Sequence, residues 1–294
     1  HWAKLGPDVF ASKIREMIAL AIANDLLWVG FHGETDDAAP DQADLSDFAI
    51  GWLQLLRAYS GGANFMDEVV ATSGIITVGE AKVLHFDAAA AVTSDAGAKA
   101  KLKISNHGLP VGMRIFIAGT TNYNGTYLVE DAGDADFIKI AKAYNAENLT
   151  AVMTATLVPD YASLDALAAD LRNAIPQELR TGLEVVMSDD LRASEEEAVY
   201  GAFGRTPTEK AAIIAALSNV AGLTPNYVTP MPAGTMLVTP PNNLAIYMHQ
   251  NITRKVEDKT ELNGFVFYNT FGGVDYIITD YRRTMGAENI FIIK

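Results

Sequence analysis

Two acidic segments carry the residue types that could bind a metal ion. The first is a proline-containing loop with five aspartates: Asp36, Asp37, Asp41, Asp44 and Asp47. Carboxylates at such close spacing could bind calcium, but the loop lacks the alternating oxygen ligands, central glycine and terminal glutamate of an EF-hand. A solvated linker is therefore the favoured interpretation. The second segment is 130–136, EDAGDAD, for which a turn between two strands is favoured over a metal site.

Histidines offer no better metal site. The five histidines are dispersed along the chain: His1, His32, His85, His107 and His249. No two of them have the spacing that would bring them together on one helix or one hairpin. Each is better explained as a surface residue or a hydrogen-bonded core residue than as a metal ligand.

Two pairs of adjacent basic residues could contact DNA phosphates or form ion pairs between subunits. They are Arg254 with Lys255 and Arg282 with Arg283. Neither pair is interleaved with aromatic residues, and neither belongs to a basic stripe. Ion pairs between subunits are therefore the favoured interpretation. The net charge of −14 also argues against a basic nucleic-acid-binding surface.

The sequence lacks the motifs of common enzymes. It contains no nucleophile elbow, phosphate-binding loop, dinucleotide fingerprint or zinc helix motif. It also contains 0 cysteines, which excludes disulfides, thiolate nucleophiles and cysteine-based zinc sites. We therefore assign no catalytic, cofactor-binding or metal-binding residue, and we predict that the chain is not an enzyme and uses no cofactor. No apolar run reaches the length of about 18 residues that a transmembrane helix needs.

The charge is unevenly distributed. Residues 230–294 carry 6 basic and 6 acidic residues, whereas residues 1–229 carry 16 basic and 30 acidic residues. This distribution fits a protein whose outer faces repel one another and whose packing surface does not. Simple solubility explains the same distribution equally well.

The elements that would position these residues begin with a helix over 10–29, ended by Gly30 and Gly33, and a short helix over 48–59. Trp52 in the second helix is predicted to be a buried anchor. From about 69 to 158, short segments rich in β-forming residues alternate with turn residues, which predicts a small β-barrel or sandwich. Its strands are expected at 74–78, 100–104, 113–118, 125–129, 137–140 and 151–158. Asn124-Gly125 predicts a tight hairpin turn.

Helical character returns after this β-rich segment. Ser163 is expected to cap a helix that Pro176 prevents from continuing, with an apolar face of Leu164, Leu167, Ala168, Leu171 and Ile175. A strand at 183–187 and a helix at 206–222 follow. Strands are then expected at 235–239, 244–250, 265–268, 276–279 and 289–293. This order predicts an α+β fold that a β module interrupts.

Six segments, in this order, resemble the major capsid protein of peduovirus-type (phage P-two-like) tailed bacteriophages. They are Ile18–Gly33, Gly51–Gln54, Asp160–Asn173, Leu183–Asp190, Pro232–Tyr247 followed by Arg254, and Asp275–Tyr281. The most informative of them is the run AGTMLVTPPNNLAIY at 233–247, two apolar strands around a Pro-Pro-Asn-Asn turn. Residues 108–140 also resemble small β domains that recur in phage structural proteins.

The resemblance implies a Hong Kong 97 type capsid fold with an inserted small β-barrel or sandwich domain. Residues 1–66 would hold the spine helix and part of the peripheral domain, 67–158 the insertion, 159–229 the axial domain, and 230–294 the return strands of the peripheral domain. The family also has an N-terminal arm and an extended loop before the spine helix, through which subunits clasp one another. Neither is found here, so we expect His1 to begin either a fragment of a longer chain or a relic that is unable to close a shell.

The function that the resemblance implies is that of a structural subunit of a tailed-phage or prophage capsid shell enclosing packaged DNA. The expected partners are copies of the chain in pentamers and hexamers, scaffold or decoration proteins, and DNA through non-specific contacts, with no membrane. The expected location is the virion capsid, and the host cytoplasm during assembly. The alternative is a host-surface or glycan-binding module carried by residues 67–158, which would then fold alone.

Overall fold

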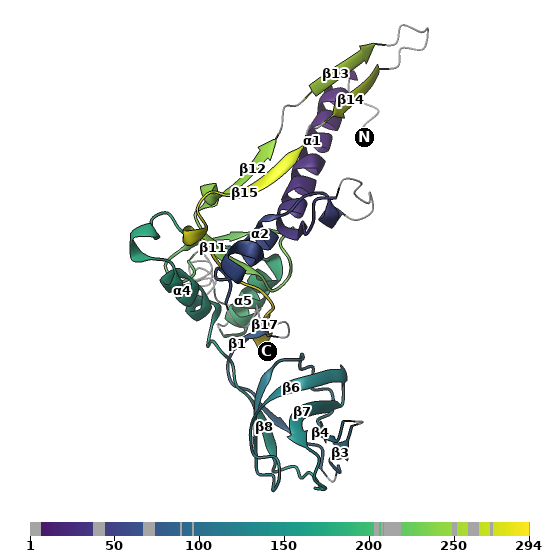
Figure 1. Ribbon diagram of the computed structural model, residues 1–294, viewed down its shortest axis with the longest axis vertical. Helices are drawn as coiled ribbons and strands as arrows, with labels where there is room; N and C mark the ends of the chain where they lie inside the picture. The colour runs from purple at the N-terminus through teal and green to yellow at the C-terminus, as the bar shows by residue number, and fades with distance from the viewer. Residues whose placement is uncertain are drawn as a thin grey trace.

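The computed structural model describes residues 7–37, 45–66, 74–88, 90–95, 97–202, 206, 208, 219–248, 252–257, 265–270 and 273–293. The molecule is elongated (Figure 1). A long helix and paired strands form one end, a mixed helical and sheet region forms the middle, and a larger sheet forms the other end. The helices are α1 (Pro7–His32), α2 (Trp52–Ala58), α4 (Leu164–Ala174) and α5 (Asp189–Ala202). One-turn 3₁₀ helices cover Leu45–Asp47, Tyr59–Gly61, Gln177–Leu179, Pro241–Asn243 and Tyr281–Arg283.

The larger sheet has seven strands in the order β2-β8-β5-β6-β7-β4-β3. They are β2 (Val83–His85), β3 (Thr93–Ser94), β4 (Lys99–Lys103), β5 (Arg114–Ala118), β6 (Gly125–Asp134), β7 (Phe137–Ala143) and β8 (Thr154–Leu157). All of the pairings are antiparallel. The strands predicted at 100–104, 113–118, 125–129, 137–140 and 151–158 are confirmed, whereas β2 and β3 are additional. Both are short, which leaves little alternating pattern to recognise.

The turn predicted at Asn124-Gly125 is longer than expected. Strand β5 ends at Ala118 and β6 begins at Gly125, so a six-residue loop joins them. Of the two residues, Gly125 has a positive φ, 138°. Asn124 instead accepts hydrogen bonds through its side-chain oxygen from the backbone and the hydroxyl of Thr120, at 2.9 and 3.0 Å. The asparagine closes the loop rather than forming a two-residue turn.

The strand predicted at 74–78 does not join the larger sheet. As β1 (Ile76–Gly79) it pairs in parallel with β17 (Ile290–Ile293). Along this ribbon, alternate residues belong to two different apolar cores. Ile76, Val78 and Ile290 pack in the core of the middle region, whereas Ile75, Phe291 and Ile293 pack against the core of the seven-stranded sheet. The two cores therefore share the β1–β17 ribbon.

A hydrogen-bonded joint adjoins this ribbon. The Asp160 carboxylate accepts from the Thr77 backbone and hydroxyl at 2.9 and 2.7 Å, and from Arg114 of β5 at 3.1 Å. The backbone N–H groups of Asp160 and Tyr161 both donate to the Thr77 carbonyl oxygen. The chain thus enters and leaves the seven-stranded sheet through two segments that are bonded to each other.

The middle region is built on a four-stranded sheet in the order β10-β9-β11-β16. Its strands are β9 (Glu184–Met187), β10 (Thr224–Tyr227), β11 (Met236–Thr239) and β16 (Met285–Ala287). Helix α4 packs against it and begins as predicted, because the Ser163 hydroxyl accepts from the Ala166 N–H at 3.2 Å. All five residues of its predicted apolar face are buried. Helix α5 was not predicted, and the helix expected over 206–222 lies mostly outside the described residues.

Helix α1 continues through Gly30, which was predicted to end it, and Gly33 follows its last residue. Gly30 packs directly beneath the Trp52 ring, where a β-carbon would lie 2.4 Å from a ring carbon. Trp52 is 3% exposed and makes edge contacts with Phe31 and Tyr276. The glycine is therefore needed for close packing between α1 and α2, and the prediction of Trp52 as a buried anchor is confirmed.

The two strands predicted around the Pro-Pro-Asn-Asn turn are confirmed, but they belong to different sheets. Strand β11 pairs with β9 and β16, whereas β12 (Leu244–Met248) pairs with β15 (Val274–Ile278). The predicted strand at 265–268 is β14 (Phe265–Thr270), which pairs with β13 (Ile252–Glu257). Both pairs run in the same general direction as α1 in the view of Figure 1, and β15 is bonded to α1 through Tyr276 and Leu26.

Candidate functional site

The acidic loop is held by its own backbone. Glu34 and Thr35 donate to the Ser46 carbonyl oxygen, and Asp37 donates to the Asp47 carbonyl oxygen at 3.0 Å. Asp36, Asp37 and Asp47 lie in the described part of this loop, whereas Asp41 and Asp44 lie outside it. The described ends of the predicted linker therefore form a closed turn after α1.

The second acidic segment was predicted to be a turn, but residues 130–134 continue strand β6, and only 135–136 form the turn into β7. Glu130 forms an ion pair with Lys99 at 2.7 Å. Asp136 accepts from the Asn106 N–H through its side chain and from the Ile104 N–H through its carbonyl oxygen. These acidic residues connect neighbouring strands and loops.

The described histidines make structural contacts. The His32 ring stacks on Trp28 at 4.3 Å between centroids, and His85 lies 3.2 Å from the Ala151 carbonyl oxygen. Buried His107 accepts from the Leu109 N–H. His1 and His249 lie outside the described residues. Within the described ranges, no three histidine, aspartate or glutamate side chains are placed to hold a metal ion. No helix in that same part of the chain is long and apolar enough to span a bilayer.

The basic pair at 282–283 has partners within the chain. Arg282 binds the Asp280 carboxylate through two nitrogens at 3.1 Å, and this holds the pKa of Asp280 below its usual value. Arg283 donates to the carbonyl oxygens of Leu179 and Thr181. Ion pairing between subunits through these residues stays a prediction. Arg254 and Lys255 lie on β13, whose side chains are not described.

Most of α1 lies outside any core. The residues of its last turns, Leu26, Val29 and Phe31, pack against α2 and β15, whereas the described residues between 12 and 21 are exposed. Met17 and Leu20 are 57% and 63% exposed. Consecutive helix residues lie about 100° apart, so the apolar residues 17, 18 and 20 point to different sides. Residues 17–23 are all apolar, whereas Lys13 and Glu16 in the turn before them form an exposed ion pair. A helix segment that is apolar all round is normally buried, so residues 17–23 of α1 are suited to being covered by another molecule.

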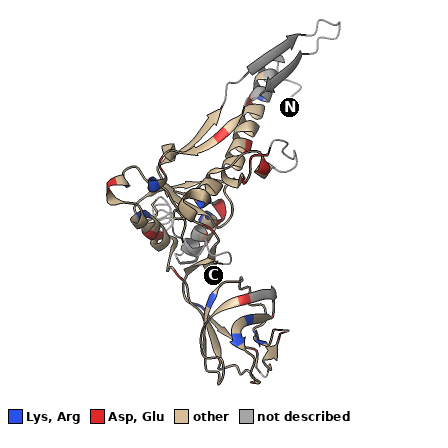
Figure 2. Ribbon diagram, in the orientation of Figure 1, with Lys and Arg blue, Asp and Glu red and all other residues tan. Residues whose placement is uncertain are grey.

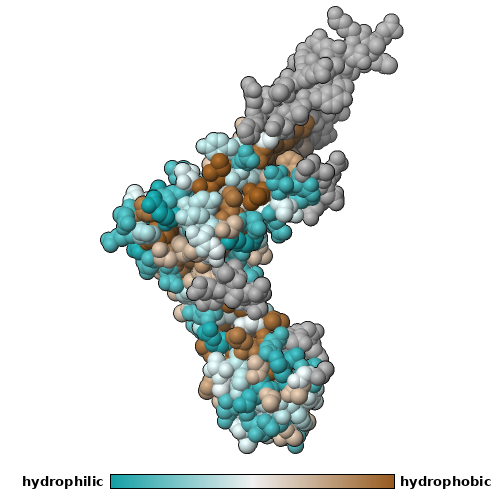
Figure 3. All heavy atoms as spheres, viewed as in Figure 1, coloured by the Kyte–Doolittle hydropathy of each residue, from teal (hydrophilic) through white to brown (hydrophobic). Residues whose placement is uncertain are grey.

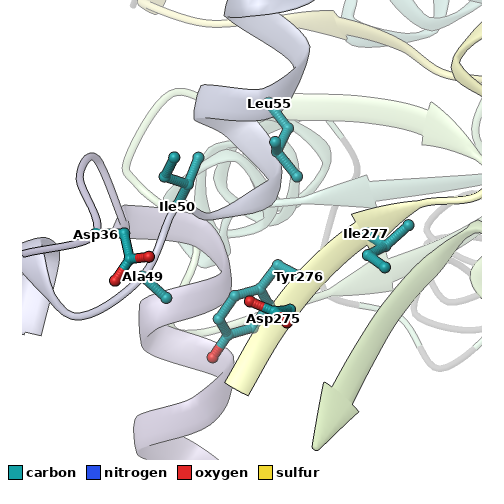
Figure 4. A pocket seen from close by; sticks show the side chains of 7 residues that line it. All are labelled: Asp36, Ala49, Ile50, Leu55, Asp275, Tyr276 and Ile277. Atoms are coloured by element: carbon teal, nitrogen blue, oxygen red, sulfur yellow. The ribbon is translucent and has the colours of Figure 1, made fainter. Parts of the chain in front are cut away.

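A pocket of about 300 Å³ lies where α2, the acidic loop and β15 meet (Figure 4). Its lining residues are Asp36, Ala49, Ile50, Leu55, Asp275, Tyr276 and Ile277. Ile50 and Ile277 are 41% and 40% exposed, so apolar side chains line an open pocket whose rim carries two carboxylates. On the neighbouring strand β12, Tyr247 lies opposite the pocket residue Asp275 and is 59% exposed. Apolar residues recur over this part of the molecule in Figure 3.

Tyr276 fixes the wall of this pocket. Its ring is buried and its hydroxyl donates to the Leu26 carbonyl oxygen of α1 at 2.7 Å. Burial raises the pKa of Tyr276 to about 12, so the hydroxyl stays protonated at neutral pH. Tyr276 therefore joins β15 to α1 through this hydrogen bond.

The sequence did not reveal one group of buried polar residues. Asn243, Thr239 and Thr284 form a hydrogen-bonded cluster beneath the Pro-Pro-Asn-Asn turn. Asn64 donates to the carbonyl oxygens of Tyr281 and Thr284 from the other side. Asn243 was interpreted only as a turn residue, and Asn64 was not singled out; their burial distinguishes both from exposed asparagines.

The exposed apolar surfaces of the described residues fit a protein that packs against others. A family model described as phage major capsid protein, P2 family, matches residues 1–101 and 122–290. Among solved structures, the chain resembles one from the satellite phage P4 procapsid including size determination (Sid) protein. That likeness has 22% identity and a TM-score of 0.59, and covers 100% of this chain and 67% of that chain.

A comparison with curated proteins finds no match. The structural likeness supports the fold, and the family match covers nearly the whole chain. Proteins of this family are structural subunits that assemble with copies of themselves into the capsid shell of the virion. The chain therefore belongs to the P2 family of phage major capsid proteins.

Proposed function

We propose that the chain adopts the Hong Kong 97 type capsid fold and that its copies form pentamers and hexamers around packaged DNA. Residues 1–66 would supply the spine helix, 159–229 the axial domain, and 230–294 the strands that return to the peripheral domain. Residues 67–158 would form the inserted domain. The length of α1, 26 residues, and the hydrogen bond that joins β15 to it support this assignment.

The largely exposed segment 17–23 of α1, in which every residue is apolar, is the observation that carries the proposal. Met17, Ile18 and Leu20 are exposed to water. Burying apolar surface contributes a free energy of about 25 cal/mol per Å², which these side chains do not contribute in the single chain. Covering them with a neighbouring copy recovers that free energy at each of the many equivalent positions of a shell. The protein would act by geometry, without catalysis or a cofactor. Assembly would take place in the host cytoplasm, with scaffold or decoration proteins as further partners.

The alternative function, a separate host-surface or glycan-binding module at 67–158, has less support. The core of the seven-stranded sheet includes Ile293, with Phe291 packed against it, and both residues lie outside that segment. Arg114 is also bonded to Asp160, beyond its end. A segment cut at these positions would lose part of its core, which favours a role for the sheet as part of the subunit.

A substitution in α1 tests the proposal. Leu20→Glu adds a charge to the exposed apolar surface without removing a buried contact, because Leu20 is 63% exposed. Expressed from its whole gene, this variant should keep the wild-type thermal midpoint and fail to form particles in sedimentation velocity. Tyr144→Glu is the control, because Tyr144 is 38% exposed and directly follows β7, far along the chain from α1. Unchanged assembly of Leu20→Glu would contradict the role of α1.

A further inference from the structure

We propose that the pocket between α2, the acidic loop and β15 binds a segment of a different protein, in which an apolar side chain is flanked by lysine or arginine. The apolar side chain would enter the pocket, and the basic side chains would lie on its acidic rim. The inference uses none of residues 17–23 of α1, on which the proposed shell contact depends, so the two can be tested separately.

The walls of the pocket are apolar and open to solvent. Ile50, which precedes α2, and Ile277 of β15 are 41% and 40% exposed, and the volume of about 300 Å³ lies at the lower end of the range of ligand pockets. The wall at Tyr276 is fixed, because its ring is buried and its hydroxyl is bonded to the Leu26 carbonyl oxygen. A pocket that is already formed needs little ordering when it is filled, so it suits the insertion of one apolar side chain.

The elements around the pocket are acidic. Residues 33–56, which include the acidic loop and most of α2, contain 6 acidic residues and 0 basic residues. Asp36 from this loop and Asp275 from β15 are exposed and line the pocket, and Figure 2 shows acidic residues on both elements. Arg57, the first cation after this stretch, is held by Glu288 at 2.8 Å. Interfaces pair surfaces of opposite charge, so the segment that binds here carries basic residues.

The same charge argument favours a different protein over a second copy. Each copy carries a net charge of −14, so an acidic pocket and another copy repel each other. Seven of the described cations already form ion pairs within the chain: Lys13, Arg57, Lys99, Lys103, Arg114, Lys139 and Arg282. A second copy that offered one of these cations would have to break its own ion pair. A protein with lysine or arginine exposed beside an apolar residue has no such loss.

A labelled peptide of alternating lysine and leucine is the probe for this chemistry. Fluorescence anisotropy measures its binding to protein expressed from the whole gene. Peptides in which glutamate replaces lysine, or serine replaces leucine, should bind about tenfold more weakly or not at all, because each lacks one half of the match. Absence of binding by the lysine–leucine peptide, or equal binding of all three peptides, would overturn the inference.

Substitutions in the pocket locate the binding. Asp36→Lys and Ile50→Ser should each weaken binding of the lysine–leucine peptide by about fivefold or more, with thermal midpoints close to that of wild type. Glu80→Lys is the control for charge, since Glu80 is exposed and follows β1. Val111→Ser is the control for apolar surface, because Val111 is 43% exposed and Ile50 is 41% exposed. Equal weakening by each variant and its control would show attraction to the whole acidic surface and would overturn the inference.

Sedimentation velocity separates the two possible occupants. Self-association of the chain should be the same for wild type, Asp36→Lys and Ile50→Ser, because the pocket is filled by a different protein. Loss of self-association in both pocket variants would identify a second copy as the occupant and would overturn the inference. Peptide binding does not depend on particle formation, so a wild-type protein that binds the peptide but forms no particles would contradict the proposed function and leave the inference standing.

Discussion

The side chain of Asn243 and the backbone of Asp280 form a closed pair of hydrogen bonds. The Asn243 amide oxygen accepts from the Asp280 N–H at 2.7 Å, and its amide nitrogen donates to the Asp280 carbonyl oxygen at 2.9 Å. Asn243 is 4% exposed, so the pair is sheltered from water. It joins the Pro-Pro-Asn-Asn turn to the segment that follows β15.

Replacing Asn243 by alanine should therefore lower the free energy of unfolding by about 2 to 3 kcal/mol, because buried groups of Asp280 and Thr284 lose their partners. The control is Asn242→Ala, since Asn242 is the exposed neighbour in the same turn and its loss should change stability by less than about 0.5 kcal/mol. Urea unfolding measures both values. Equal effects of the two substitutions would show that the closed pair contributes little.

At the hydrogen-bonded joint, removing the Asp160 side chain should lower the free energy of unfolding more than removing the Arg114 side chain. Asp160 accepts from Thr77 twice and from Arg114 once, and its side chain is 14% exposed against 48% for Arg114. Asp160→Ala should cost about 2 to 4 kcal/mol because it leaves buried donors of Thr77 unpaired. Arg114→Ala should cost less than about 1 kcal/mol, the range of exposed ion pairs. Urea unfolding measures this difference, and an Arg114 effect as large as that of Asp160 would contradict the description of the joint.

The close packing of Gly30 against Trp52 predicts that Gly30→Ala destabilises the protein, although Gly30 lies inside a helix. Alanine in a helix normally gains about 1 kcal/mol over glycine. At Gly30, however, a β-carbon would lie 2.4 Å from Trp52, and overpacking of this kind costs about 1 to 3 kcal/mol or more. The thermal midpoint of Gly30→Ala should therefore fall. Gly97→Ala is the control, since its β-carbon would meet its nearest neighbour at 3.4 Å, and its midpoint should stay close to that of wild type.

The lowered pKa of Asp95 predicts that the stability of the protein depends on pH. Its pKa lies below the ordinary value of 3.8, first because Lys139 binds its carboxylate and next because the Lys99 N–H donates to it. A depressed folded pKa adds stability above pH 3.8 that is lost as pH falls through the folded value. Asp95→Asn should flatten the decline of stability below that pH. Chemical unfolding at a series of pH values checks this, and a slope identical to that of wild type would exclude the contribution.

Local signals predicted much of this fold. Helix α4 was predicted correctly because its cap, Ser163, its apolar spacing and Pro176 lie within one short segment. The anchor Trp52 and most strands of the seven-stranded sheet were predicted for the same reason. Helix α5 was missed because its sequence has an acidic first turn, at Asp189 and Asp190, but no clear helical spacing of apolar residues.

The remaining features depend on contacts between distant residues. The β1–β17 ribbon joins Ile76 to Ile290, and no local pattern determines which strand an apolar segment such as 74–78 will pair with. The burial of Asn243 is likewise set by the segment that packs over it. The contact surfaces could not be predicted from periodicity, because the sequence shows that a residue is apolar but not whether its own chain covers it.

Imaging the purified protein tests the central claim, that this chain builds a capsid shell, most directly. Protein expressed from its whole gene should form closed particles in electron microscopy. A reconstruction should show copies of this chain as the repeating unit, with the exposed half of α1 covered by neighbours. A strictly monomeric protein at every concentration and salt condition, or particles in which α1 remains in solvent, would contradict the account.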